Sequence, residues 1–139
     1  MKNTLKTLIL STCLYLIPKS TNAQLAVRYE KKIFSFYNCE NFYDTIDQKN
    51  IIDEEFTPNS TKGYNQKIYS LKLKQIARTI YELGKQEKQD GLSLIGLVEI
   101  ENKKVLEDLI NDPLIKKYHY QIIHFDSKDY RGIDVALIY

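Results

Sequence analysis

The sequence contains no tryptophan, a single methionine, two cysteines, three prolines and five glycines in 139 residues. So little proline and glycine excludes a collagen-like chain or a linker-type composition. The apolar fraction of 43% is ordinary for a globular protein and too high for a disordered tail. The length allows one domain. Tyrosine is abundant instead, with 11 residues, which favours strands or a polar-rimmed groove.

The sequence also lacks an apolar run long enough to cross a bilayer, which needs about 20 residues. Residues 8–17 form a mostly apolar run that follows Lys2 and Lys6 and precedes a small and polar stretch over residues 18–23. A buried helix is the alternative, but this order is typical of a signal peptide. We therefore expect residues 1–23 to be a signal peptide cut after Ala23. The mature protein, residues 24–139, would be exported to the periplasm or the outside, without a stable membrane span.

Removal of the signal peptide changes the charge and the cysteine content. Three of the 20 Lys and Arg residues lie before residue 24, so 17 basic residues face 18 acidic ones, for a net charge of −1. Bulk charge therefore gives no reason to expect a nucleic-acid partner, and any attraction to phosphate must be local or mediated by a metal. Cys39 remains as a single cysteine. The fold must then depend on a packed core, because no internal disulfide can form.

The hydrophobic pattern predicts an α/β protein with a mixed sheet. Strands are expected over residues 27–40, 92–98, 118–125 and 133–139, and helices over residues 66–83 and between Asn102 and Pro113. Both rows of the first strand are largely apolar, which is typical of a strand covered on both faces. Gly84 is expected to end the first helix and Asn102 to cap the second. Residues 41–65 form an acidic loop, longer than compact domains usually contain without a purpose.

Polar side chains occur where the predicted strands end. Asn38 and Glu40 are two residues apart, which puts them on one side of a strand, and Glu99 follows the most apolar strand. Arg131 and Asp134 flank the start of the last strand. Oxygen donors of this kind suit Mg²⁺, or Mn²⁺ or Ca²⁺, better than zinc or copper. On spacing alone, the same residues could also be turn formers on a solvated edge.

Other polar residues have simpler interpretations. His119 and His124 fall on opposite faces of a predicted strand, where structural or surface roles are the expectation. Cys39 has no nearby thiol or patterned base and is expected to be a small packed residue. The acidic residues of the long loop lack the glycine and the spacing of an EF-hand, so a solvated loop is expected.

Three segments together resemble the endonuclease/exonuclease/phosphatase superfamily. Residues 37–44, YNCENFYD, look like its opening strand motif, and residues 96–102, GLVEIEN, look like the buried strand that ends in a metal-binding Glu. Residues 131–139, RGIDVALIY, are similar to the third block, and residues 53–58, DEEFTP, resemble exported bacterial members. The resemblance covers residues 33–139. It implies a DNase-I-like fold, of which this chain would form half of a two-layer β-sandwich flanked by helices.

The resemblance also implies roles for individual residues. Glu99 matches the main ligand of the divalent metal, and Glu40 stands where many members have an Asp or Glu near that metal. Asn38 matches the Asn that orients the phosphate and the attacking water, and would be catalytic. Tyr130 and Arg131 fall near the turn that contacts the phosphate. Asp134 belongs to the third motif, with no role that the resemblance assigns. The implied reaction is Mg²⁺-dependent hydrolysis of a phosphodiester, with DNA among the substrates.

The sequence departs from the family pattern in one respect. Family members continue into a second half with an Asp-x-Asn motif and a terminal Asp-His motif, which supplies the general acid and base, and neither motif occurs here. The expectation is an N-terminal half, truncated and inactive alone, whose partner is a missing C-terminal half. The alternatives are a non-catalytic exported binding module and the remnant of a truncated gene.

Overall fold

A computed structural model describes residues 29–86 and 90–139, so the predicted signal peptide lies outside the described residues. The chain divides into two units, Met1–Glu30 and Lys31–Tyr139, and every element below belongs to the second unit. None of the helices in the described residues has the length and apolar character that a membrane crossing requires.

The second unit is built on a four-stranded mixed sheet. Its strands, in spatial order, are β1 (Phe34–Phe42), β2 (Leu94–Ile100), β4 (Asp134–Ile138) and β3 (Ile122–Phe125). The pair β1–β2 is parallel, and β4 runs antiparallel to both β2 and β3. A parallel pair needs a long connection between its strands, and here that connection contains α2 (Gln66–Gln86). The α/β class with a mixed sheet is therefore confirmed.

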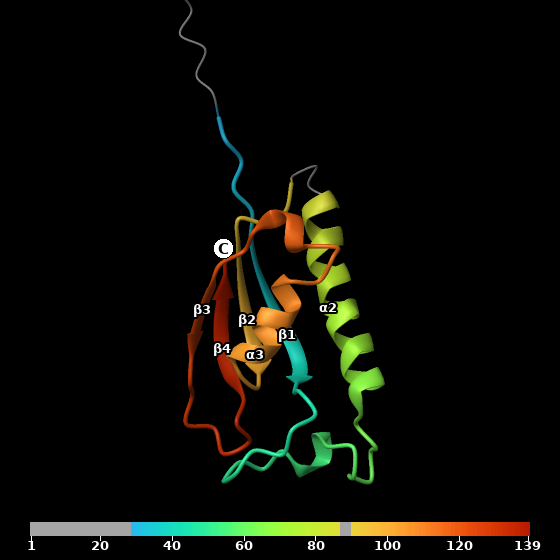
Figure 1. The fold of residues 1–139 in the computed structure, drawn as a ribbon. Coiled ribbons are helices and arrows are strands. Elements are labelled where there is room, and N and C mark those ends of the chain that lie inside the picture. Colours follow the sequence, from blue (N-terminus) through green and yellow to red (C-terminus); the bar gives the residue numbers. More distant parts are fainter. Residues whose placement is uncertain (1–28, 87–89) are drawn as a thin grey trace, which may run out of the picture. The chain divides into compact units, whose positions relative to one another are not determined.

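Both helices lie on the same face of the sheet (Figure 1). Helix α2 buries Tyr69, Ile76 and Ile80, which repeat at intervals of seven and four residues. Helix α3 (Lys103–Ile110) buries Val105, Leu106 and Leu109. These side chains meet Ile95, Leu97 and Ile138 of the sheet in one hydrophobic core. Two 3₁₀ helices, η1 (Glu54–Phe56) and η2 (Lys116–Tyr118), lie in the connections.

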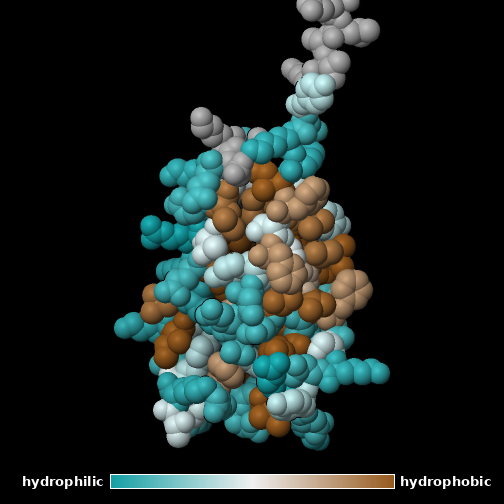
Figure 2. Space-filling view, turned by 180° about the vertical axis from the view of Figure 1, so that it is seen from behind, coloured by the Kyte–Doolittle hydropathy of each residue, from teal (hydrophilic) through white to brown (hydrophobic). Residues whose placement is uncertain are grey.

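The opposite face of the sheet is not covered by the described residues. We call it the open sheet face; it comprises the exposed side chains of Phe34, Phe36, Ile123, Phe125 and Val135. Figure 2, seen from behind the sheet, shows apolar side chains gathered there. Within the described residues, β1 is therefore covered on one face, not on both as expected. The physical reason is that α2 and α3 both pack on the other side.

Several predicted boundaries are wrong because the tertiary structure overrides local signals. Helix α2 continues past Gly84 to Gln86. A Cβ on Gly84 would lie 3.0 Å from the Cα of Gly91, so glycine serves the close approach of two backbones there. The strand expected from residue 118 begins at Ile122 instead, after η2 and a left-handed His119 (φ 55°). His119 is thus not in a strand. The first strand also begins later than expected, at Phe34.

The cap predicted for the second helix is confirmed. The side-chain oxygen of Asn102 accepts a hydrogen bond of 3.1 Å from the N–H of Val105. Its side-chain amide also donates to Oδ2 of Asp44, 3.1 Å away. One residue thus begins α3 and ties it to the loop that follows β1.

Replacement of this cap should weaken the fold. Asn102→Ala leaves the Val105 N–H without its partner, so we expect the free energy of unfolding to fall by about 1 kcal/mol. Asn102→Ser keeps a capping oxygen, so its free energy of unfolding should stay close to that of the unaltered protein. Urea unfolding followed by circular dichroism would measure both variants. Equal stability of Asn102→Ala and the unaltered protein would contradict the role of the cap.

Candidate functional site

The ends of the parallel strands β1 and β2 meet at the carboxylate of Glu99. The side-chain amide of Asn38 donates to Oε1 of Glu99 at 3.0 Å, and the backbone N–H of Asn41 donates to Oε2 at 2.9 Å. The pairing of Asn38 with Val98 in the ladder brings the two strand ends to the same edge of the sheet. The structure therefore brings Asn38 and Glu99 together, although they are separated by α2 in the sequence.

The backbone at this edge is irregular. Glu40, Asn41 and Glu99 have positive φ angles of 53°, 62° and 60°. The left-handed conformation costs a residue with a side chain roughly 1–2 kcal/mol, and such residues cluster at functional sites. The register of β1 shifts between Asn38 and Phe42, so the alternation that was used to place Glu40 beside Asn38 does not hold. Instead, the N–H of Glu40 donates to the side-chain oxygen of Asn38 at 2.7 Å.

A cation from α2 also reaches this edge. The Lys72 ammonium donates to the backbone oxygen of Glu40 at 2.5 Å. Burial lowers the pKa of Lys72, and the negative charges of Glu40 and Glu99 oppose that shift. Sequence reasoning missed Lys72, although a signal exists. It is three residues after Tyr69 and four before Ile76, so helical spacing places it beside the buried stripe.

The residues at this edge fit a hard divalent cation. Oε1 of Glu99 accepts a hydrogen bond from Asn38 and Oε2 accepts one from Asn41, so each oxygen keeps a lone pair, and Glu99 is partly exposed. The side-chain oxygen of Asn38 adds a further oxygen atom at this edge, with no thiol or imidazole among these donors. A contribution from the Glu40 carboxylate stays a prediction. Magnesium commonly binds through one or two carboxylates and keeps several waters, so this small set is sufficient for it.

The turn that carries Tyr130 and Arg131 lies beside the same edge. Both residues line a cavity of about 340 Å³ that Asn41 and Tyr43 also line. The Tyr43 hydroxyl donates to the backbone oxygen of Arg131 at 2.7 Å and so anchors the turn to the end of β1. The Arg131 guanidinium forms two hydrogen bonds with the Asp129 carboxylate, of 3.0 and 2.8 Å, which lower the pKa of Asp129 to about 2.

Asp134 takes no part in this cavity. It is the first residue of β4, and its carboxylate accepts a hydrogen bond from the Ser127 N–H at 2.7 Å. Its other oxygen lies 2.9 Å from Nε2 of His124. Of the candidate residues Tyr130, Arg131 and Asp134, the first two share this cavity. Asp134 lines a different cavity, of about 500 Å³, which Tyr130 also lines.

Part of the acidic loop is buried, which corrects the expectation of a solvated loop. Asp53 and the nearby Glu101 are only 2% and 4% exposed. Glu101 accepts hydrogen bonds from the Asp44 N–H and the Gln48 side-chain amide, and Asp53 accepts one from the Gln48 N–H. Burial raises the pKa of Asp53, and it raises the pKa of Glu101 to about 7 against the opposing effect of the Asp44 hydrogen bond. These hydrogen bonds hold the loop against two buried carboxylates, whose burial the periodicity of the sequence did not predict.

Cys39 is buried at 3% exposure, as expected of a packed residue. Burial raises the pKa of its thiol to about 12. The thiolate is the nucleophilic form, so Cys39 is not suited to nucleophilic catalysis at neutral pH.

Comparison with known proteins gives one family. The sequence profile of the Endonuclease/Exonuclease/phosphatase family matches residues 33–139, which include both strand ends described above. No curated protein and no solved structure matches the chain.

The buried Glu101 predicts a pH dependence of stability. Its pKa is raised from 4.5 to about 7, so the folded state holds a proton that the unfolded state releases earlier. The contribution of Glu101 to the free energy of unfolding is therefore fully present below pH 4.5. It is lost as the pH rises to about 7, which lowers the free energy of unfolding by up to about 3 kcal/mol. Glu101→Gln should flatten the fall in unfolding free energy over this window, measured by urea titration at several pH values.

A matched control is Glu107→Gln, on the exposed side of α3. This variant should keep the slope of the unaltered protein. A slope that is the same in Glu101→Gln would show that other groups carry the pH dependence.

Proposed function

The chain belongs to the endonuclease/exonuclease/phosphatase family, and on that premise we propose that it contributes to divalent-metal-dependent hydrolysis of a phosphodiester. The family match supports a phosphoesterase or nuclease-like domain. The single observation that carries the finer proposal is the hydrogen-bonded pair of Asn38 and Glu99 at the shared edge of two parallel strands. In open α/β sheets, sites collect beyond strand ends because side chains from several strands converge there.

We propose that Glu99 is the main metal ligand and that Glu40 supplies a second carboxylate. The proposed ion is Mg²⁺, which Mn²⁺ or Ca²⁺ could replace. When bound, such a cation supplies Lewis-acid stabilisation of the charge that develops on a phosphodiester. Asn38 is assigned to orient Glu99 and the phosphate. The Asn41 N–H fixes the other carboxylate oxygen, so Glu99 cannot rotate freely.

The net charge of the exported part gives no preference for DNA, so the proposed substrate rests on positive side chains near the site, which would attract a phosphate. Lys72 of α2 contacts the backbone of Glu40 at the site, and Arg131 and Lys62 line the neighbouring cavity. Tyr130 is 71% exposed and is assigned to contact the substrate beside its phosphate. We propose DNA or another phosphodiester as the substrate, and export after cleavage at Ala23 as the localisation.

We propose that a second layer of the sandwich packs against the open sheet face. An apolar face of this kind costs free energy in water, roughly 25 cal/mol for each Å² that could be buried. The aromatic ring of Phe36 packs over Gly96, since a Cβ on residue 96 would lie only 2.6 Å from that ring. Side chains on this face therefore already pack against neighbouring strands. We propose that the C-terminal half of the family fold covers it, and that the 139-residue chain by itself hydrolyses little or no phosphodiester.

Magnesium binding tests the assignment of the site. The Asn41 amide donates to Glu99, so its NMR shift reports locally on the carboxylate. We expect Mg²⁺ to shift this resonance, Glu99→Gln to abolish saturable binding, and Asn38→Ala to weaken it by roughly 10–100-fold as a positioning residue would. Glu107→Gln is the matched control and should bind like the unaltered protein. Undiminished Mg²⁺ binding by Glu99→Gln would refute the assignment.

The open sheet face makes a second prediction. Phe36→Ser and Phe125→Ser should reduce binding of the dye ANS and reduce self-association, measured by sedimentation, because both rings are exposed there. The unfolding free energy should change by less than about 1 kcal/mol, as is usual for exposed positions. Ile46→Ser, at an exposed loop residue away from this face, is the control. A protein that is monomeric and binds no ANS would contradict the need for a second layer.

A further inference from the structure

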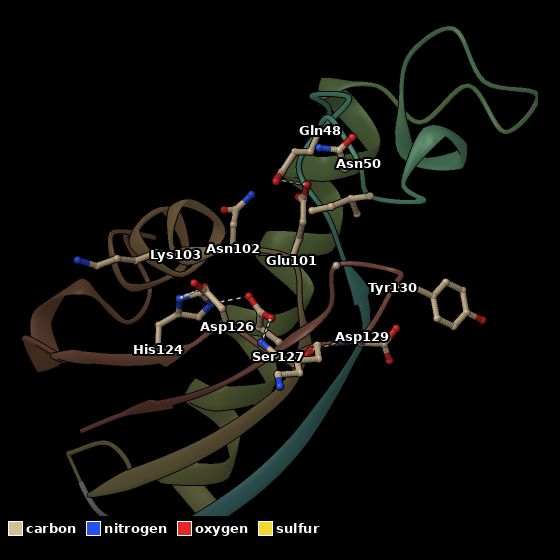
Figure 3. Close-up of a pocket in the computed structure, with 14 residues that line it drawn as sticks. Gln48, Asn50, Glu101, Asn102, Lys103, His124, Asp126, Ser127, Asp129 and Tyr130 are labelled. Atoms are coloured by element: carbon tan, nitrogen blue, oxygen red, sulfur yellow. Dashed lines mark hydrogen bonds and ion pairs between the residues drawn. The ribbon is translucent and has the colours of Figure 1, made fainter.

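A second polar cluster lies at the other end of the sheet's strand order, between β3 and β4. His124 is on β3, Asp126 follows that strand, and Asp134 begins β4. These strands are antiparallel, with Phe125 paired to Val135, so the end of β3 lies beside the start of β4. The three side chains line a cavity of about 500 Å³ whose other walls include Glu101, Asn102 and Ser127 (Figure 3).

Both nitrogens of the His124 ring face a carboxylate. Nε2 lies 2.9 Å from Oδ2 of Asp134, and Nδ1 lies 3.6 Å from Oδ1 of Asp126. The His124 and Asp134 side chains are only 11% and 9% exposed, whereas the Asp126 side chain is 92% exposed. The Ser127 N–H already donates to the remaining oxygen of Asp134, which fixes that carboxylate in place.

This arrangement leaves one contact unexplained for a neutral ring. A neutral imidazole has one N–H and one lone pair, so it can donate to only one of two carboxylates. The other nitrogen then presents a lone pair to an anion. A bound cation removes this conflict, because it accepts the lone pair of the imidazole and offsets the charge of the carboxylates.

We propose that His124, Asp126 and Asp134 form a binding site for a borderline divalent transition metal such as Zn²⁺. One ligand atom from each residue lies within 4.8 Å of the other two. Ligands held at the usual roughly 2.0–2.2 Å from zinc lie somewhat closer together, and the exposed Asp126 is free to move in by a change of rotamer. The imidazole favours Zn²⁺ over Mg²⁺ or Ca²⁺, which prefer oxygen alone.

This site shares no residue with the Asn38–Glu99 edge and does not depend on the proposed function. It closes the turn of residues 126–133 at its base, since its ligands come from both sides of that turn. The turn carries Tyr130 and Arg131. Metal binding would therefore restrain the segment that lines the neighbouring cavity, and the three ligand residues themselves line the 500 Å³ cavity.

The chain contains its own control, because it has two histidines. His119 lies outside the cluster with a left-handed backbone, which asparagine tolerates well, so His119→Asn is a conservative match for His124→Asn. All variants have the same cysteine content, so any binding by thiols is a constant background. Introducing each change into a Glu99→Gln protein removes the other candidate metal site from the measurement.

The test is calorimetric titration of these proteins with Zn²⁺ at neutral pH, with Co²⁺ absorption as a second readout of the ligand geometry. We expect one Zn²⁺ to bind to Glu99→Gln and to Glu99→Gln/His119→Asn with equal affinity. His124→Asn and Asp126→Asn should each weaken binding at least tenfold. Asp126 is exposed, so its variant will fold even if the His124 variant does not.

Zinc should also move the ring-nitrogen resonances of His124 and leave those of His119 in place. Two outcomes would overturn the proposal. One is Zn²⁺ affinity that is equal in the Asp126→Asn variant and its parent. The other is a His124 ring that is protonated on both nitrogens and unchanged by Zn²⁺, which would make the cluster an ion pair that holds the turn without a metal.

Discussion

The candidate site depends on the Glu99 carboxylate, which joins the ends of two parallel strands. Its two oxygens accept hydrogen bonds from the Asn38 side chain and the Asn41 backbone, both on β1. These contacts are possible only because α2 connects β1 to β2 in the parallel sense. The left-handed backbone at Glu40, Asn41 and Glu99 then turns both chains at the edge. The burial of α2 offsets the conformational cost of this irregular edge, because it fixes the two strands that support it.

The sheet separates two regions with different physical properties. On one face, α2 and α3 bury a core that includes Ile80, Leu97 and Leu106. On the other, the open sheet face exposes aromatic and branched side chains to water. A protein that evolved for a solvated face would carry polar residues in alternate positions of these strands. Their apolar character supports our proposal that a second layer covers this face.

Polar groups are distributed along the strand ends in two clusters. At one, the Glu99 carboxylate accepts hydrogen bonds from two N–H groups of β1. At the other, the His124 ring of β3 lies beside the carboxylates of Asp126 and Asp134. The turn of residues 126–133 connects β3 to β4 and is anchored from both directions. Tyr43 holds the Arg131 backbone, and Asp134 holds Ser127. The position of Tyr130 and Arg131 therefore depends on contacts with both the end of β1 and the start of β4.

The sequence by itself determined the order of the elements, the buried stripe of α2, the Asn102 cap and the family to which the chain belongs. These follow from periodicity, capping chemistry and short motifs, which are local properties of the chain. It also identified Asn38 and Glu99 as candidates, but only the strand pairing brought them within hydrogen-bonding distance. Lys72, the burial of Asp53 and Glu101, and the loss of His119 from its predicted strand depended on tertiary structure as well. Each of them rests on contacts between segments far apart in the sequence, and such contacts leave no local pattern.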